Sequence, residues 1–310
     1  MRAEGGSPTV RVRATHLVQG IDPEGAGDAV AVIEAGPGEP GQARAVFVPG
    51  RLPCGECAIC RRGLCAACPA ARAGLSRQQA AGVDLPERYL TPLDDPQVAA
   101  LDPVIIAGAG LVAEALDATA RSGLGPGETA IWIGDGPWTL VGASFTARRG
   151  CRTFLLGGDA AAAVGEGVTR LPAGAGSARW LAVIGESEAA VTAGPHAGRP
   201  ERRIYVYSRD AELAQSALAL SVPGATLSFR LGAPPVLSGL DAAPVLRVLI
   251  GGGYHPDLVP EALAALARGH VDISGVLREV DLREVESAVD SFRSGRDPRV
   301  PVVRLDKPAP

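Results

Sequence analysis

Five of the six cysteines in this 310-residue chain lie in one short stretch that begins at Cys54 and ends at Cys68. Four of them follow the spacing C-x2-C-x2-C-x7-C, which lets a folded-back loop bring four thiolates to the corners of one tetrahedron around Zn²⁺. A closed four-thiolate site leaves no position for water, so it holds structure and performs no chemistry. The sequence therefore predicts one structural zinc ion per chain, with Cys54, Cys57, Cys60 and Cys68 as ligands.

A disulfide cluster or a set of free thiols is the alternative interpretation of the same cysteines. The first residues, Met-Arg-Ala-Glu-Gly-Gly, contain no apolar segment of the kind that directs export, so we expect a reducing, cytoplasmic location. Cys65, the fifth thiol of the stretch, is an alternative fourth ligand, although the longer spacing favours Cys68. Cys151 lies far along the chain and is expected to be a small buried residue.

Charge and hydropathy exclude several classes of partner. Lys plus Arg number 30 and Asp plus Glu 34, a net charge of −4, so we expect no broad basic face for nucleic acid. We find no apolar run near the roughly 18 residues that a membrane span needs, so no membrane association is expected. Lys307 is the only lysine, which excludes a catalytic lysine unless the tail folds back.

The first part of the chain is predicted to be all-β. Residues 1–104 contain short β-prone runs between Gly/Pro clusters, whereas residues 71–85 show no period and are predicted to form a loop. Residues 104–122 are predicted to form a helix with Gly123 at its C-terminal cap. The β-prone runs are 10–13, 29–34 and 43–48.

Strands and helices alternate further along, which predicts a parallel, doubly wound sheet of Rossmann type. The predicted helices in this part span residues 138–149 and 212–220. Two more are predicted near the C-terminus, at 258–266 and after a capping-box pattern of Asp281 and Glu284. The predicted strands are 129–133, 152–156, 180–184, 204–207 and 225–229.

The cysteine stretch, with Pro49 and Leu52-Pro53 before it and Arg61-Arg62-Gly63 within it, resembles the structural-zinc lobe of the zinc-containing alcohol dehydrogenases. These enzymes are medium-chain dehydrogenase/reductases, and the resemblance covers nearly the whole chain, most weakly over the first 45 residues. Within that superfamily the sequence looks most like the 6-hydroxycyclohex-1-ene-1-carbonyl-CoA dehydrogenases. The segments that carry this resemblance are 45–49, 52–57, 88–94 and 203–205.

The resemblance implies a GroES-like β-barrel domain that carries the zinc lobe, together with a Rossmann-type domain. The barrel is expected to comprise residues 1–104 and 271–310, and the nucleotide-binding domain residues 105–270. Many relatives form dimers through the edge strand of the nucleotide domain, so a homo-oligomer or a related partner subunit is expected. The runs 225–229 and 245–250 are candidate edges, and ordinary buried strands are the equally weighted alternative.

The turn Gly134-Asp135-Gly136-Pro137-Trp138-Thr139 lies between a predicted strand and a predicted helix, the context of a dinucleotide fingerprint. Gly134 and Gly136 permit a tight turn and a close approach of the backbone to a pyrophosphate. Pro137 removes one N–H, Trp138 adds bulk, and Thr139 stands where a third glycine lets helix and strand pack closely. The alternative interpretation is a strand-to-helix turn kept only for folding.

The acidic residue that holds the ribose in the family is displaced here. The family position falls on Gly157, and Asp159 comes two residues later, where a slightly longer turn would bring it back. A glycine at that position removes an acid that repels a 2′-phosphate, so both NAD and NADP are candidate cofactors. The predicted cofactor-binding residues are Gly134, Gly136, Trp138, Thr139 and Asp159.

The catalytic zinc of the family has no recognisable ligands in this chain. No cysteine precedes Cys54, Pro23 replaces the family histidine, and residues 106–109 offer no donor side chain at the expected third position. The resemblance therefore predicts that the catalytic zinc site is lost. Glu24 remains from the family motif, and His16 is a candidate general base, although a lone histidine is more often structural.

Two functions follow from this sequence. The first is an NAD(P)-dependent oxidoreductase without catalytic zinc, acting on a cyclic alcohol or enone, with a CoA thioester as one substrate class. The second is a non-catalytic relative that serves as a structural partner or a ligand-binding subunit for a small molecule.

Overall fold

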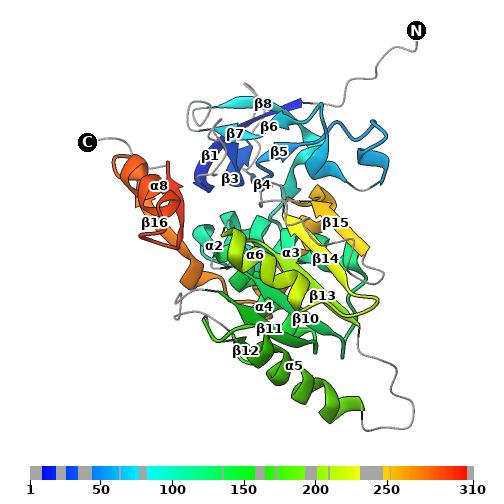
Figure 1. Ribbon diagram of the computed structural model, residues 1–310. Helices are drawn as coiled ribbons and strands as arrows, with labels where there is room; N and C mark the ends of the chain where they lie inside the picture. The colour runs from blue at the N-terminus through cyan, green and yellow to red at the C-terminus, as the bar shows by residue number, and fades with distance from the viewer. Residues whose placement is uncertain are drawn as a thin grey trace. The chain divides into compact units, whose positions relative to one another are not determined.

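A computed structural model describes most of the chain (Figure 1). The chain divides into two compact units. The first unit comprises Met1–Ala113, His255–Gly269 and Ile273–Pro310, and the second Glu114–Tyr254 and His270–Asp272. The described residues are 9–18, 26–33, 44–62, 64–76, 82–134, 136–157, 165–171, 174–192, 201–208, 210–230, 247–251 and 253–305.

The first unit is built on a mixed sheet whose central strand is β1 (Thr9–Val18). Among the described residues the sheet has seven strands in the order β16-β17-β1-β3-β4-β9, with β8 also paired to β1. The C-terminal strand β17 runs antiparallel to β1, so the end of the chain completes a sheet that its beginning starts. The other bounds are β3 Ala29–Ile33, β4 Arg44–Val48, β8 Val83–Pro86, β9 Thr91–Pro92, β16 Leu277–Asp281 and β17 Val300–Arg304.

Buried and more exposed residues alternate along β1, and the buried ones contribute to the core of this unit. Val12, Ala14 and Leu17 are buried and pack with apolar side chains of β3, β4 and β8. The predicted β-prone runs fall on β1, β3 and β4, so the prediction of an all-β first part is confirmed there. The predicted loop at 71–85 is wrong, because it contains β6 (Arg72–Ala73), β7 (Leu75–Ser76) and β8, and two-residue strands are too short to show a period.

The first two helices of the first unit are short, and each is capped by an aspartate. The Asp95 carboxylate caps α1 (Pro96–Ala99) and the Asp102 carboxylate caps α2 (Pro103–Ala107), each accepting a first-turn N–H at 2.8 Å. The predicted capping box before α8 (Val285–Arg293) is wrong: Asp281 ends β16, and the cap residue Glu284 makes no side-chain cap bond.

The predicted helix at 104–122 is broken at Gly108 into α2 and α3 (Ala109–Ser122). A Cβ at residue 108 would lie 2.7 Å from Leu277 Cδ1, so the chain approaches its neighbour closely there. The stretch Pro103–Ser122 is long and apolar enough to cross a membrane, contrary to the expectation from sequence, yet 78% of the apolar window is buried within the protein. This degree of burial is typical of a core helix.

The second unit is a parallel sheet with the strand order β12-β11-β10-β13-β14-β15, the doubly wound arrangement that the sequence predicts (Figure 1). Helices α5 (Ser177–Thr192) and α6 (Ala211–Ala219) supply buried side chains to one face. Helix α4 (Pro137–Arg148) packs on β10 and β11, and Gly142 of α4 leaves room for the Trp132 ring. The strand bounds are β10 Thr129–Ile133, β11 Arg152–Leu156, β12 Val168–Leu171, β13 Arg202–Val206, β14 Thr226–Arg230 and β15 Arg247–Gly251.

One predicted strand of this sheet is wrong, and one real strand is missing from the prediction. Residues 180–184 lie inside α5, where Trp180 and Ile184 are buried one helical turn apart. A short apolar run cannot be assigned to strand or helix from its pattern alone. Strand β12, whose exposed Thr169 and Arg170 hide its apolar positions, takes the place at the edge of the sheet.

The bounds of the two compact units differ from those of the expected domains. Helix α7 (Val259–Ala267) belongs to the first unit because it packs on α1, whereas the sequence places residues 105–270 together. Of the two candidate edge strands, β14 is paired on both sides and is therefore interior. Strand β15 ends the described strand order.

Candidate functional site

The cysteine lobe is a loop closed at its base by two very short strands. Strand β5 (Arg51–Leu52) enters the lobe and pairs antiparallel with β6, which leaves it. Between them lie two single 3₁₀ turns, Cys60–Arg62 and Cys65–Ala67. The lobe therefore has almost no core of its own apart from the cysteines, which cluster with Ala71.

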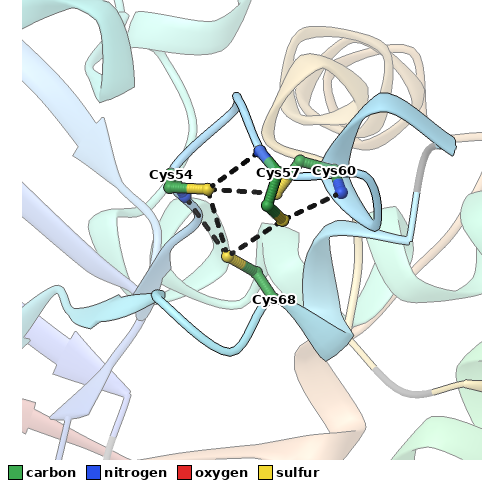
Figure 2. Close-up of side chains that lie close together, drawn as sticks. All are labelled: Cys54, Cys57, Cys60 and Cys68. Carbon is green, nitrogen blue, oxygen red and sulfur yellow. Dashed lines mark hydrogen bonds between the residues drawn. The ribbon is translucent and has the colours of Figure 1, made fainter.

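Four sulfur atoms of the lobe point toward one another (Figure 2). The separations are 3.9 Å from Cys54 Sγ to Cys60 Sγ, 3.9 Å from Cys57 Sγ to Cys68 Sγ and 3.6 Å from Cys68 Sγ to Cys54 Sγ. A tetrahedral ion with Zn–S bonds of about 2.3 Å separates its sulfurs by about 3.8 Å, whereas a disulfide needs about 2.05 Å. The arrangement therefore fits a four-thiolate zinc site, and none of these cysteines forms a disulfide.

Backbone N–H groups prepare this cluster for negative charge. The Cys57 N–H points at Cys54 Sγ and the Cys60 N–H at Cys57 Sγ, both at 3.4 Å. Gly55, at φ +77°, provides the left-handed residue that turns the chain back on the first sulfur. Hydrogen bonds from the backbone of Glu56 and then of Cys57 lower the pKa of Cys54 to about 6, which favours its thiolate.

Cys60 has the opposite tendency, because burial raises the pKa of its thiol above the ordinary value. A cluster that contains such a thiol takes up full negative charge only with a compensating cation, as zinc supplies. Cys65 is just as buried but lies outside the four-sulfur group, so the structure brings Cys68 and not Cys65 to the fourth corner. Cys151 is also buried, as the sequence predicts, in the second unit.

Tyr89 forms a hydrogen bond to the start of the lobe. Its hydroxyl donates to the carbonyl of Pro53, the residue before the first cysteine. The Arg88 guanidinium lies 4.9 Å from the centroid of the Tyr89 ring. This contact gives a physical role to the Arg88-Tyr89 part of the segment that resembles the dehydrogenases.

The glycine turn of the second unit lies between β10 and α4, as predicted. Gly134 has φ +145°, and a Cβ on it would lie 2.7 Å from Thr139 Oγ1 and 3.0 Å from the backbone of Tyr207. Gly136 is the N-terminal cap of α4 at an ordinary φ of −85°, with Pro137 in the first turn. Gly134 is therefore required by the fold itself, whereas Gly136 is not.

The Trp138 and Arg230 side chains lie beside this turn. A Cβ on Gly136 would lie 3.7 Å from the Trp138 ring, so that ring faces the second glycine. The Arg230 guanidinium, at the end of β14, lies 4.0 Å from the Trp138 ring centroid. Arg230 Nε also donates to Glu114 Oε1 at 2.8 Å, and Glu114 is buried. We call this chain of contacts the Glu114–Arg230–Trp138 bridge.

Beneath the turn lie Thr139 and Tyr207. Thr139 is fully buried, and its hydroxyl has no hydrogen-bond partner among the described residues. Burial, followed by the carboxylate of Glu114, raises the pKa of Tyr207 well above its ordinary value, so this phenol stays neutral. The backbone of the turn suits a dinucleotide, and the half-buried Trp138 ring lies beside Gly136, where a pyrophosphate would approach.

The remaining predicted site residues are scattered or lie outside the described residues. His16 is buried on β1, with Nδ1 3.2 Å from Thr15 Oγ1, in the interior of the first unit's sheet. His255 caps a 3₁₀ turn by accepting the Asp257 N–H. Glu24 and Asp159 fall outside the described residues, and Ile106 and Ala107, near the expected third zinc ligand, are buried apolar side chains.

Sequence reasoning missed Glu114 and Arg230. They are 116 positions apart, and neither belongs to a motif. The available signal was an arginine directly after the apolar run 225–229, which the sequence predicts to be a strand.

Comparison with known proteins establishes the fold. No protein-family model matches the sequence, and no curated protein matches it. An alcohol dehydrogenase from a Thermus species superposes with a TM-score of 0.72 at 20% identity, covering 96% of this chain and 93% of that chain. A cobalt- and zinc-bound thermostable alcohol dehydrogenase from Pyrobaculum aerophilum gives 0.68 at 15%, covering 97% and 92%.

A third similar structure is an Escherichia coli protein named as a short-chain alcohol dehydrogenase and solved with NADH. It superposes with a TM-score of 0.72 at 14% identity, covering 97% of this chain and 92% of that chain. The chain therefore has the fold of these alcohol dehydrogenases, with a GroES-like unit and a Rossmann unit.

Proposed function

We propose that this protein is a divergent oxidoreductase of the zinc-type medium-chain dehydrogenase/reductase class, with a structural zinc and without a catalytic one. Its substrate class is a cyclic alcohol or enone, including a CoA thioester of such a ring, and its cofactor is NAD or NADP. The observation that carries the proposal is the glycine turn at the carboxyl end of β10, in a sheet with Rossmann strand order. Similar folds solved with NADH and with zinc support it.

The zinc half of the proposal rests on the cysteine geometry. Sulfur separations of 3.6 to 3.9 Å match one tetrahedral ion, and the bound ion would fix the lobe without joining the reaction. Metal analysis of the purified protein tests it, with about one zinc per chain expected. Two ions per chain would overturn the proposed loss of the catalytic site.

The cofactor half rests on the turn and on helix α4. A helix N-terminus of this kind favours a pyrophosphate, and Gly134 and Gly136 would lie against it. Calorimetric titration with NAD, NADH, NADP and NADPH tests this half directly. The absence of any response at millimolar cofactor would eliminate the dehydrogenase proposal.

A second candidate function is favoured by the Glu114–Arg230–Trp138 bridge. Side chains that cover the nucleotide turn suit a non-catalytic relative that acts as a structural partner or ligand-binding subunit. The same titrations separate the two candidates, because a non-catalytic subunit has no need for dinucleotide affinity.

We also propose a homodimer formed through β15, the strand that ends the described sheet order. A strand at this position offers backbone groups to a second copy, which would extend the sheet across the interface. Sedimentation analysis of the protein, compared with a Leu249→Lys variant on this strand, tests the proposal. A monomeric protein would contradict it.

A further inference from the structure

The carboxyl end of the second unit's sheet has one point at which the strand order reverses. Strands β11 and β12 lie on one side of β10, while β13, β14 and β15 lie on the other. In doubly wound sheets ligands bind outside the carboxyl ends of the strands at this switch point. The turn at Gly134, after β10, and the segment at Tyr207, after β13, flank it here.

The Glu114–Arg230–Trp138 bridge crosses that point. Strand β13 lies between β10 and β14, and neighbouring strands are about 4.8 Å apart, so the ends of β10 and β14 are separated by about 10 Å. Trp138 follows β10, and Arg230 is the last residue of β14. Because the guanidinium lies 4.0 Å from the ring centroid, the two side chains together span the end of β13.

The bridge is anchored at its far end by a buried charge. Arg230 donates to both oxygens of Glu114, at 2.8 and 3.5 Å, and the Glu114 side chain is only 6% exposed. Moving Arg230 away would leave a buried carboxylate without this cation, which is strongly unfavourable. Arg230 is therefore held over Trp138 and is not a freely moving surface residue.

We propose that the bridge closes the switch-point crevice to a dinucleotide and that Glu114 is the residue that holds it closed. The inference rests on the proposed function, in which this crevice takes NAD or NADP. A pyrophosphate reaches the second glycine by close approach to its backbone, and here the Trp138 ring faces Gly136. Binding therefore requires Trp138 and Arg230 to separate, so an intact bridge opposes affinity.

The test compares two double variants with the unmodified full-length protein. Glu114→Gln with Arg230→Met removes the bridge without leaving a buried charge unpaired. The matched control is Asp117→Asn with Arg121→Met, which removes the other carboxylate–guanidinium pair of α3, 2.9 Å long and also largely buried. NADH and NADPH are titrated into each protein by calorimetry, and acrylamide quenching, referenced to Trp138→Phe versions, reports exposure of that ring.

We expect the bridge variant to bind NADH or NADPH at least ten-fold more tightly and to expose Trp138 to the quencher, while the control stays within two-fold. Equal or weaker binding in the bridge variant would overturn the inference and leave the proposed function standing. An equal gain in the control would also overturn it, since loosening of α3 would then be the cause. If no protein binds either nucleotide, both the bridge as a barrier and the cofactor half of the proposed function fail.

Discussion

The cysteine lobe and the nucleotide turn are both glycine-containing loops at the end of a strand, but they differ in what surrounds their backbone. In the lobe, the sulfurs, the N–H groups aimed at them and Gly55 all serve one tetrahedral site. In the turn, Gly134 keeps the required backbone, while the Trp138 ring lies beside Gly136 and the buried Thr139 hydroxyl has no described partner. In a loop kept for binding, both the backbone and the side chains suit the ligand, whereas in a loop kept for folding only the backbone does.

The largest expected loss of stability comes from removing a zinc ligand, which tests whether folding of the lobe depends on the metal. Cys60→Ser should abolish zinc binding and destabilise the first unit by at least about 3 kcal/mol, because metal binding free energy here is folding free energy. Cys65→Ser is the matched control, since both thiols are about equally buried, at 5% and 4% exposure, but only Cys60 belongs to the four-sulfur group.

Zinc content by plasma spectrometry and thermal unfolding of both variants provide the measurement. The control should retain about one zinc per chain and lose only a small packing contribution. Zinc loss in Cys65→Ser with retention in Cys60→Ser would show that Cys65, and not Cys60, is a zinc ligand, which would contradict the four-sulfur group.

The next effect separates folding from binding within the turn. Gly134→Ala should cost about 2 to 3 kcal/mol, because φ is +145° and the new Cβ would lie 2.7 Å from Thr139 Oγ1. Gly136→Ala should change stability by less than about 0.5 kcal/mol, since its φ of −85° is ordinary. It should nevertheless weaken any dinucleotide binding, because the methyl group lies where a pyrophosphate would approach.

Chemical denaturation and nucleotide titration of the two glycine variants check this pair. If Gly136→Ala leaves nucleotide affinity unchanged, the turn serves folding alone. That result would sharpen the contrast with the lobe and would favour the non-catalytic candidate.

A smaller effect is expected at Gly55 in the lobe. Its φ is +77° and no other atom lies within 4 Å of the position that a Cβ would take, so Gly55→Ala meets only backbone strain of about 1 to 2 kcal/mol. Gly55→Asn should cost less, because asparagine adopts the left-handed conformation more readily. Thermal unfolding of the zinc-loaded variants gives the comparison, and equal costs for both substitutions would argue against a strain mechanism.

The sequence predicts local features well and long-range ones poorly. The four cysteines are local in sequence, and strand 129–133 coincides with β10 because its apolar residues are bounded by clear turn signals. The pattern of residues 180–184 predicts a strand because five apolar residues look alike in either structure, and only their packing in α5 decides.

The contacts that make up the bridge could not have been found from sequence. Glu114 and Arg230 are 116 positions apart and meet only after the sheet is wound, and Glu114 is one of several charged residues on α3. The sequence predicts where the turn lies, whereas the arginine that packs on Trp138 comes from β14. Sequence therefore locates the turn and the bulk of Trp138 beside it, but not the contacts that Arg230 and Glu114 add.

The smallest expected change in stability is a gain, and it tests whether the Thr139 hydroxyl makes a hydrogen bond. Thr139→Val should stabilise the protein by about 0.5 to 1 kcal/mol, because it replaces a buried hydroxyl that lacks a described partner with a methyl group of equal size. Thr146→Val on the same helix is the control, and it should be destabilising by about 1 to 3 kcal/mol, since its equally buried hydroxyl bonds Trp132 and Thr153. Thermal unfolding of the two variants distinguishes them. A loss of stability in Thr139→Val would mean that the Thr139 hydroxyl has a hydrogen-bond partner. Backbone and side chains would then agree in the turn as they do in the lobe.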